Sequence, residues 1–235
     1  MNRKQATFGR CSTLASTLLL VLAVAVVYAQ PVDLRVDGKR LNASLSQLRT
    51  IGLNENGGSD RVAYSQYNKD GLDYLSELMS ESGLDSHIDV AGNLVGRRPG
   101  RLSGLAPIIT GSHIDTVPNG GHYDGIVGSL AAIEVARTLH ESGYVTDHPL
   151  EVIVWSNEEG GKTGSRSING SVVPDEMNLQ SLGDKSLGEG IAFIGGAPDR
   201  LLENKREPGS VAALLELHIE QGAILDRKDI SIGVV

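Results

Sequence analysis

Three apolar runs in this chain, each typical of a buried β-strand, lead directly into histidine and acidic residues. The runs and the residues after them are 107–109 before His113 and Asp115, 151–155 before Glu158 and Glu159, and 211–217 before His218. Helical patterns separate the runs, and this alternation predicts an α/β fold with a mixed, mostly parallel sheet and helices on both faces. Parallel strands end at one edge of a sheet, where open α/β folds hold their functional sites. We therefore expect these polar residues to converge.

The spacing of the other apolar residues predicts the rest of the secondary structure. Apolar positions three and four apart indicate amphipathic helices, and two short runs joined by a glycine turn indicate a hairpin. The expected elements are helices at 36–51, 69–82 and 129–142, a hairpin at 87–96, a loop at 160–171, short helices at 174–182, 187–194 and 198–203, a brief helix after Glu220 and a last strand at 230–235.

The first 29 residues have the layout of a secretory signal peptide. A basic start is followed by the apolar run 18–27 and by a small residue, Ala29, before the polar Gln30. The run is shorter than the roughly 20 residues that span a bilayer. We expect cleavage after Ala29, export to the periplasm or the extracellular space, and a catalytic domain that begins at residue 30.

Charge and cysteine content limit the partners of the mature chain. The first 29 residues hold three basic side chains, no acidic ones and the single cysteine, Cys11. Without them 18 Lys and Arg remain against 29 Asp and Glu, and the net charge falls from −8 to −11. So acidic a chain repels phosphate backbones, which argues against nucleic acid as a partner. It also has no disulfide to form.

The loop at 111–128 holds an imidazole and two carboxylates close together in the sequence. His113 and Asp115 alternate as strand neighbours do, and Asp124 follows a turn rich in glycine and proline. With His218, these residues offer nitrogen and oxygen ligands without a thiolate, a set that suits Zn²⁺ or Mn²⁺. A carboxylate can bridge two ions about 3.5–4 Å apart, and Asp124 suits that role.

The acidic pair Glu158 and Glu159 ends the second run. Neighbouring residues at a strand end point in different directions, so one can bind a metal while the other stays free as a general base. Taken singly, this pair also fits a solvated acidic turn, and His113 or His218 fits a hydrogen-bonded structural histidine. Three such groups behind three strands favour a shared site. A serine nucleophile is not indicated, because no Gly-x-Ser-x-Gly elbow occurs.

Five short motifs cover the polar ends of the three runs. They are Gly-Ser-His-Ile-Asp-Thr-Val (111–117), Gly-Gly-His-Tyr-Asp-Gly-Ile-Val-Gly (120–128), Asn-Glu-Glu-Gly-Gly (157–161), Thr-Gly-Ser-Arg (163–166) and Leu-His-Ile-Glu-Gln-Gly-Ala-Ile-Leu-Asp (217–226). The motifs resemble those of the N-carbamoyl-L-amino-acid hydrolases and allantoate amidohydrolases. These enzymes belong to the di-metal superfamily that includes aminoacylases and glutamate carboxypeptidases, and the similarity runs from about residue 41 to residue 235.

The resemblance implies a role for each of these residues. As metal ligands it implies His113 and His218 on one ion, Glu159 on a second ion, and Asp124 as the bridge between them. It also implies Glu158 as the general base, Asp115 as the carboxylate that orients His113, and Gln221 as a residue that touches substrate. A cis peptide bond after Asp124 belongs to the same family pattern.

The implied reaction is metal-assisted hydrolysis of the carbamoyl or ureido C–N bond of N-carbamoyl-L-amino acids or related ureido acids. Two alternatives stay open: a peptidase or N-acyl amino acid deacylase of the same superfamily, and an inactive remnant that only binds metal. Family members are longer, so we expect residues 30–235 to be the N-terminal part of a catalytic domain, in which a second ion would have only Asp124 and Glu159. A homodimer is implied for a full-length protein but is doubtful for this chain.

Overall fold

The computed structural model describes residues 33–235, in which five strands form one sheet in the order β1-β2-β4-β3-β5. The strands are β1 (Asp85–Ile88), β2 (Leu94–Arg98), β3 (Ile108–His113), β4 (Leu150–Trp155) and β5 (Ala213–Leu215). Strand β3 pairs in parallel with β4 and β5, whereas β2 pairs antiparallel with β1 and β4. The predicted α/β class and mixed sheet are confirmed, with parallel and antiparallel pairings in equal number among the described strands.

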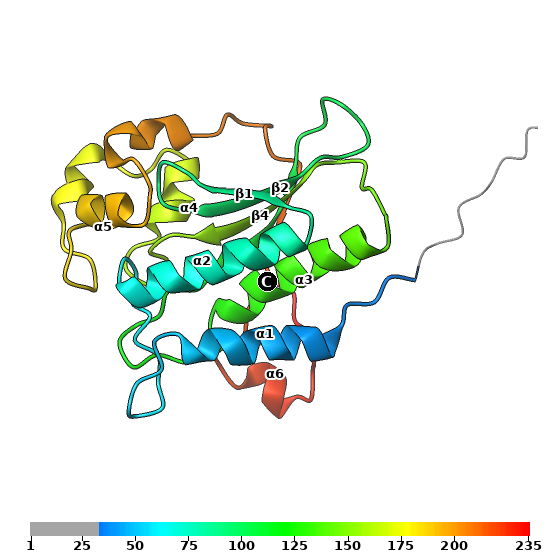
Figure 1. The fold of residues 1–235 in the computed structure, drawn as a ribbon, viewed down its shortest axis with the longest axis horizontal. Helices are drawn as coiled ribbons and strands as arrows, with labels where there is room; N and C mark the ends of the chain where they lie inside the picture. Colours follow the sequence, from blue (N-terminus) through cyan, green and yellow to red (C-terminus); the bar gives the residue numbers. More distant parts are fainter. Residues whose placement is uncertain (1–32) are drawn as a thin grey trace, which may run out of the picture. The chain divides into compact units, whose positions relative to one another are not determined.

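Three long helices lie together on one side of the sheet (Figure 1). They are α1 (Gly38–Thr50), α2 (Gln66–Glu81) and α3 (Ile126–Glu141). Helix α2 packs on β1 and β2, α3 packs on β3 and β4, and α1 packs against α3. Side chains cap the first two helices: Asp37 accepts from the backbone N–H groups at the start of α1, and Ser65 accepts from the N–H of Asn68 in α2. These three helices match the predicted ones in number and order.

Strand β4 lies inside the sheet, and all six of its residues are buried. Because side chains alternate across a sheet, they divide between two apolar clusters. Leu150, Val152 and Val154 belong to the main core beneath the long helices. Ile153 and Trp155 belong to a smaller cluster on the opposite face, where Ile168 of α4 (Thr163–Ile168) packs on them. Helices therefore contact both faces of the sheet.

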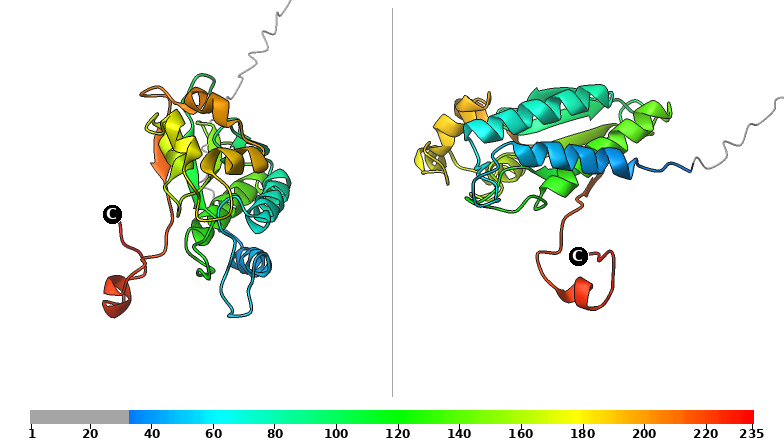
Figure 2. Two further views of the ribbon diagram at one scale, coloured as in Figure 1. Left: turned by 90° about the vertical axis from the view of Figure 1, so that its left-hand side faces the viewer. Right: turned by 60° about the horizontal axis from the view of Figure 1, so that its bottom comes forward.

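Short helices occupy one end of the sheet (Figure 1). They are η1 (Pro174–Asn178), α5 (Leu187–Phe193) and η2 (Pro198–Asn204), which pack on one another. The segment after β5 contains α6 (Ile224–Arg227) and lies apart from the other helices in both views of Figure 2.

Three sequence expectations are wrong. Residues 230–235 form no strand, because no neighbouring strand supplies hydrogen bonds to them and Ile232 is 76% exposed. The expected loop at 160–171 contains α4, since Gly164 packs tightly against Asn93 and Ser156 and holds the turn. No cis peptide bond occurs in residues 33–235, and the chain turns after Asp124 through Gly125 at a φ of 65°.

No helix within the described range has the length and apolarity needed to cross a membrane. The predicted signal peptide, residues 1–29, lies outside the described residues.

Replacing Leu75 by alanine tests the assignment of the main core. Leu75 in α2 is fully buried in that cluster, so the lost burial and the cavity are expected to lower the free energy of unfolding by about 2–5 kcal/mol. Urea denaturation followed by circular dichroism measures the change. Val135 in α3 is 40% exposed, and Val135→Ala is expected to cost less than about 0.5 kcal/mol. Equal losses in the two variants would contradict the assignment.

Candidate metal centre

The register of the parallel strands brings the predicted residues to one edge of the sheet. His113, the last residue of β3, lies opposite Trp155, the last residue of β4. On the other side of β3, Thr110 lies opposite Leu215, the last residue of β5. Three residues further along the chain, β3 reaches His113 and the segment after β5 reaches His218. The polar groups that follow all three strands are therefore neighbours in space.

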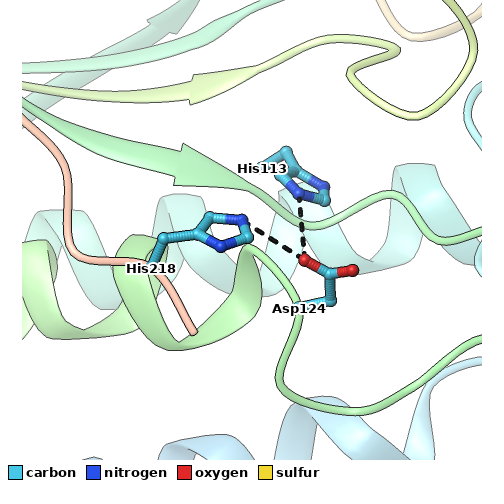
Figure 3. Close-up of side chains that lie close together, drawn as sticks. All are labelled: His113, Asp124 and His218. Atoms are coloured by element: carbon cyan, nitrogen blue, oxygen red, sulfur yellow. Dashed lines mark ion pairs between the residues drawn. The ribbon is translucent and has the colours of Figure 1, made fainter. Parts of the chain in front are cut away.

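His113, Asp124 and His218 point toward one another (Figure 3). The Oδ1 atom of Asp124 lies 3.2 Å from Nε2 of His218 and 3.9 Å from Nε2 of His113. Their ligand atoms all lie within 4.8 Å of one another, close enough to hold one metal ion. The two imidazole rings are stacked, with centroids 6.0 Å apart. The predicted convergence of these three residues is confirmed.

Backbone carbonyls select the tautomer that each imidazole ring adopts when it is neutral. Nδ1 of His113 lies 2.9 Å from the carbonyl oxygen of Asp115, and Nδ1 of His218 lies 2.9 Å from that of Ile219. A carbonyl oxygen can only accept, so each Nδ1 carries a hydrogen and each neutral ring presents a lone pair at Nε2. Metal-binding histidines in proteins are commonly held in this way.

The Oδ1 atom of Asp124 is buried and has no hydrogen-bond partner in the described chain. Because both facing Nε2 atoms are acceptors in the neutral rings, they cannot donate to it. Three electron-rich atoms thus face one point, an arrangement that a cation relieves. Two imidazole nitrogens and one carboxylate oxygen also match the donor types of Zn²⁺ and Mn²⁺. The residues present therefore fit a divalent metal ion.

Gly125 leaves room for the ring of His113 at this centre. A Cβ atom on Gly125 would lie 2.2 Å from Cδ2 and 2.3 Å from Nε2 of His113. Gly125 also has a φ of 65°, a left-handed conformation that side chains disfavour. It directly precedes α3, so this turn places Asp124 at the positive end of the helix dipole, which favours a carboxylate.

Asp115 orients His113 through its backbone rather than through its carboxylate. Its carbonyl accepts from the imidazole, while Oδ1 of its carboxylate lies 3.7 Å from Nδ1 of His113. The carboxylate instead accepts the backbone N–H groups of Glu158 and Glu159, at 3.3 and 3.1 Å. Burial raises the pKa of Asp115 to about 6, although His113 and these two N–H groups favour its charged form. Asp115 therefore links the end of β3 to the acidic pair after β4.

The two glutamates differ in the contacts that they make near the centre. Oε2 of Glu158 is 3.7 Å from Nε2 of His113, and Oε1 is 3.8 Å from Nζ of Lys162. Glu159 does not join the three-residue group. Burial raises the pKa of the Glu159 carboxyl, with His113 opposing the shift and the charges of Asp124 and Glu158 adding to it. The acidic pair thus lies near the centre, and the separate roles expected for its members stay predictions.

The segment after β5 is anchored to the centre by a few polar contacts. Gln221 donates from Nε2 to Oδ2 of Asp124 at 2.5 Å, and its expected contact with substrate stays a prediction. Ser112 donates to Glu216 at 2.5 Å. Gly128 provides the close approach, since a Cβ atom there would lie 2.1 Å from the carbonyl oxygen of Leu217. These contacts hold His218 beside β3.

Comparison with known proteins agrees with this geometry. Residues 109–235, more than half of the chain, match the family described as "Peptidase family M20/M25/M40". The chain belongs to this family. The M20/M25/M40 match includes all the residues that meet at the centre, from His113 to Gln221.

Several relatives of this M20/M25/M40 chain have names that describe hydrolases of carbamoyl or ureido compounds. An N-carbamoyl-L-amino acid amidohydrolase of Geobacillus stearothermophilus is 38% identical over 85% of this chain and 50% of its own length. A ureidoglycolate hydrolase of Arabidopsis thaliana is 34% identical over 86% and 45%. The crystal structure of a hydantoinase/carbamoylase family amidase from Burkholderia ambifaria is 37% identical, with a TM-score of 0.74, over 83% and 48%. The chain spans about half the length of the curated relatives it matches.

One contact of the centre was not expected from the sequence. Arg61 is fully buried beside the loop that follows β3 and donates to the carbonyl of Ile114. It lies more than 50 residues before His113, in a segment without regular apolar spacing, so no local pattern marks it. Only an unexplained arginine directly after a glycine- and asparagine-rich loop could have drawn attention to it.

Replacing Gly125 by alanine tests the packing against His113. The added methyl group is expected to push the ring away from Asp124 and to lower the Zn²⁺ affinity by about 10–100-fold, as changes beside a ligand do. Competition with a chromogenic chelator measures the affinity. A Cβ atom on Gly121 in the same loop would have no neighbouring atom within 4 Å, so Gly121→Ala should bind like the wild type. An unchanged affinity in Gly125→Ala would contradict the described ring position.

Proposed function

We propose that this chain is the metal-binding part of an amidohydrolase that cleaves the carbamoyl or ureido C–N bond of N-carbamoyl-L-amino acids or related ureido acids. The convergence of His113, Asp124 and His218 from three separate segments is the observation that carries the proposal. The names of the relatives support the substrate class, because carbamoyl and ureido hydrolases recur among them. A small molecule is the partner that fits such relatives.

The chain's own residues divide the work of a hydrolysis between them. His113, His218 and Asp124 would hold a divalent ion, which when bound makes water more acidic and polarises a carbonyl group. Glu158 Oε2 lies 3.7 Å from Nε2 of His113, next to this position, and serves as the base that takes a proton from water. The same carboxyl group then gives the proton to the leaving nitrogen. Asp115 keeps Glu158 in place through its backbone N–H.

The identity and number of the ions are part of the proposal. Zn²⁺ or Mn²⁺ suits the three-residue site, because both accept imidazole nitrogen and carboxylate oxygen. A second ion would rely on Asp124 and Glu159 alone within this chain. Gln221 already donates to the Oδ2 atom of Asp124, so a second site that shares this carboxylate would be the weaker one.

A substrate panel tests the reaction. The 235-residue chain is loaded with Zn²⁺ or Mn²⁺ and assayed with N-carbamoyl amino acids, ureidoglycolate, N-acetyl amino acids and dipeptides. Ammonia release from the carbamoyl or ureido compounds is expected, and Glu158→Gln should reduce it by about 10²–10⁴-fold because the base is lost.

The variants and substrates distinguish the alternatives. Glu158→Gln should keep the metal affinity of the wild type, whereas His218→Ala should lose it, since His218, unlike Glu158, is a proposed ligand. Preferred cleavage of N-acetyl amino acids or dipeptides would instead indicate a deacylase or peptidase. Metal binding without hydrolysis of any of these substrates would indicate a remnant that only binds metal.

Export is a separate proposal, which rests on the basic start and apolar run of residues 1–29. Expression of the full chain in a bacterium with a secretion pathway should give a protein that begins at Gln30 in the periplasm or medium. N-terminal sequencing by mass spectrometry measures this. A chain that keeps Met1 and stays in the cytoplasm would contradict export. The predicted lack of nucleic-acid binding and the homodimer of a full-length protein stay predictions.

A further inference from the structure

The fully buried Arg61 has no role in the chemistry described above. Its side chain has no exposed surface, which is rare for a charged residue unless its partners justify the burial. Burial lowers the pKa of Arg61 to about 10, with the charge of Asp115 opposing the shift, so the guanidinium is charged at neutral pH. A buried charge of this kind is costly, and its contacts indicate what it holds in place.

The guanidinium of Arg61 joins the loop after β3 to the end of helix α1. Nε donates to the carbonyl of Ile114 at 2.7 Å. Ile114 lies between His113 and Asp115 in the sequence. Nη1 donates to the carbonyls of Leu48 and Ile51 at 3.1 and 2.8 Å. Nη2 has no hydrogen-bond partner within residues 33–235. The guanidinium group therefore links Ile114 to the C-terminal end of helix α1.

Backbone groups of residues 59–61 also form hydrogen bonds with the loop that follows β3. The carbonyl of Arg61 accepts the N–H of Thr116 at 3.0 Å, and the carbonyl of Ser59 accepts from Oγ1 of Thr116 at 3.2 Å. Ser59 and Gly120 exchange two backbone hydrogen bonds, at 2.8 and 2.9 Å. Main chain and side chain together fix residues 114–120, which lie between His113 and Asp124.

Helix α2 leaves space for this side chain. Gly71 stands inside α2, where a glycine is less favourable than alanine. A Cβ atom there would lie 3.0 Å from Cδ of Arg61 and 3.0 Å from Cδ1 of Ile114. The glycine thus admits the arginine between α2 and the loop.

We propose that Arg61 is a positioning residue for the metal centre, which acts by holding the carbonyl of Ile114, the residue that joins His113 to Asp115 in the chain. The carbonyl of Asp115 holds the ring of His113, and its carboxylate holds the N–H groups of Glu158 and Glu159. A loop released by the loss of Arg61 therefore disturbs a metal ligand and the acidic pair together. This inference rests on the proposed function for its link to metal binding.

The test compares Arg61 with a second buried arginine. Arg98 in β2 is 8% exposed, donates to the backbone carbonyl of Tyr144 and has an unpartnered Nη1. It does not contact the loop after β3 through any described hydrogen bond. Arg61→Met, Arg61→Lys and Arg98→Met are prepared in the full chain, and thermal unfolding of each metal-free variant first measures the general loss of stability.

Two readouts then report on the centre itself. Hydrogen exchange of the Glu158 and Glu159 amides, measured without metal by NMR, is expected to become at least about tenfold faster in Arg61→Met. Zn²⁺ affinity should fall by about 10–100-fold, with a changed visible spectrum of the Co²⁺ form. Arg61→Lys should retain part of the amide protection and part of the Zn²⁺ affinity, because lysine keeps the positive charge but lacks the planar guanidinium group. Arg98→Met should leave both unchanged even where its thermal unfolding shifts as much.

The outcomes separate this inference from the proposed function. Wild-type amide exchange and Zn²⁺ affinity in folded Arg61→Met would overturn the positioning role, as would equal effects in Arg98→Met. If Arg61→Met does not fold, the amide exchange and Zn²⁺ affinity of Arg61→Lys decide on the positioning role in the same way. A wild type that binds no metal would refute the proposed function, and the amide exchange would still decide on Arg61.

Discussion

The parallel pairing of β3 with β4 and β5 is the constraint on which the centre depends. Each ladder fixes where its strands end relative to one another, and side-chain direction follows from that register. Gly111 within β3 permits the close pairing, because a Cβ atom there would lie 1.9 Å from the carbonyl oxygen of Ile153. A shift of one residue in either ladder would turn His113 or His218 away from Asp124. The chemistry at this edge is thus a consequence of backbone hydrogen bonding.

Hydrogen bonds with backbone groups then orient the side chains that the strand pairing brings together. Carbonyl groups select the Nδ1–H form of both imidazoles, and the carboxylate of Asp115 takes two N–H groups from the acidic pair after β4. The loop that carries these groups has few apolar side chains to pack, so polar contacts with residues 59–61 hold it. Burying the charges of Asp115 and Arg61 is costly. The attraction between these two opposite charges offsets part of that cost.

Much of the fold could be predicted because apolar periodicity reflects burial directly. The helix at 129–142 corresponds to α3, and the run at 151–155 corresponds to β4. The failures share a cause, since α4 depends on the packing of Gly164 against Asn93, and the segment 230–235 lacks a pairing strand. Both depend on contacts with distant parts of the chain, which local patterns do not contain. The same limit hid Arg61, whose partners Leu48 and Ile114 lie 13 and 53 residues away.

The amino-acid sequence by itself determined the residue types of the centre and the strands that carry them, because polar clusters behind apolar runs are a local property of the chain. It also determined the resemblance that led to the family. Only the tertiary structure decided that Asp115 binds His113 through its carbonyl, that Gln221 lies on Asp124, and that a buried arginine secures the loop. Those contacts depend on strand register and on the distances between segments remote in sequence, and both exist only once the chain has folded.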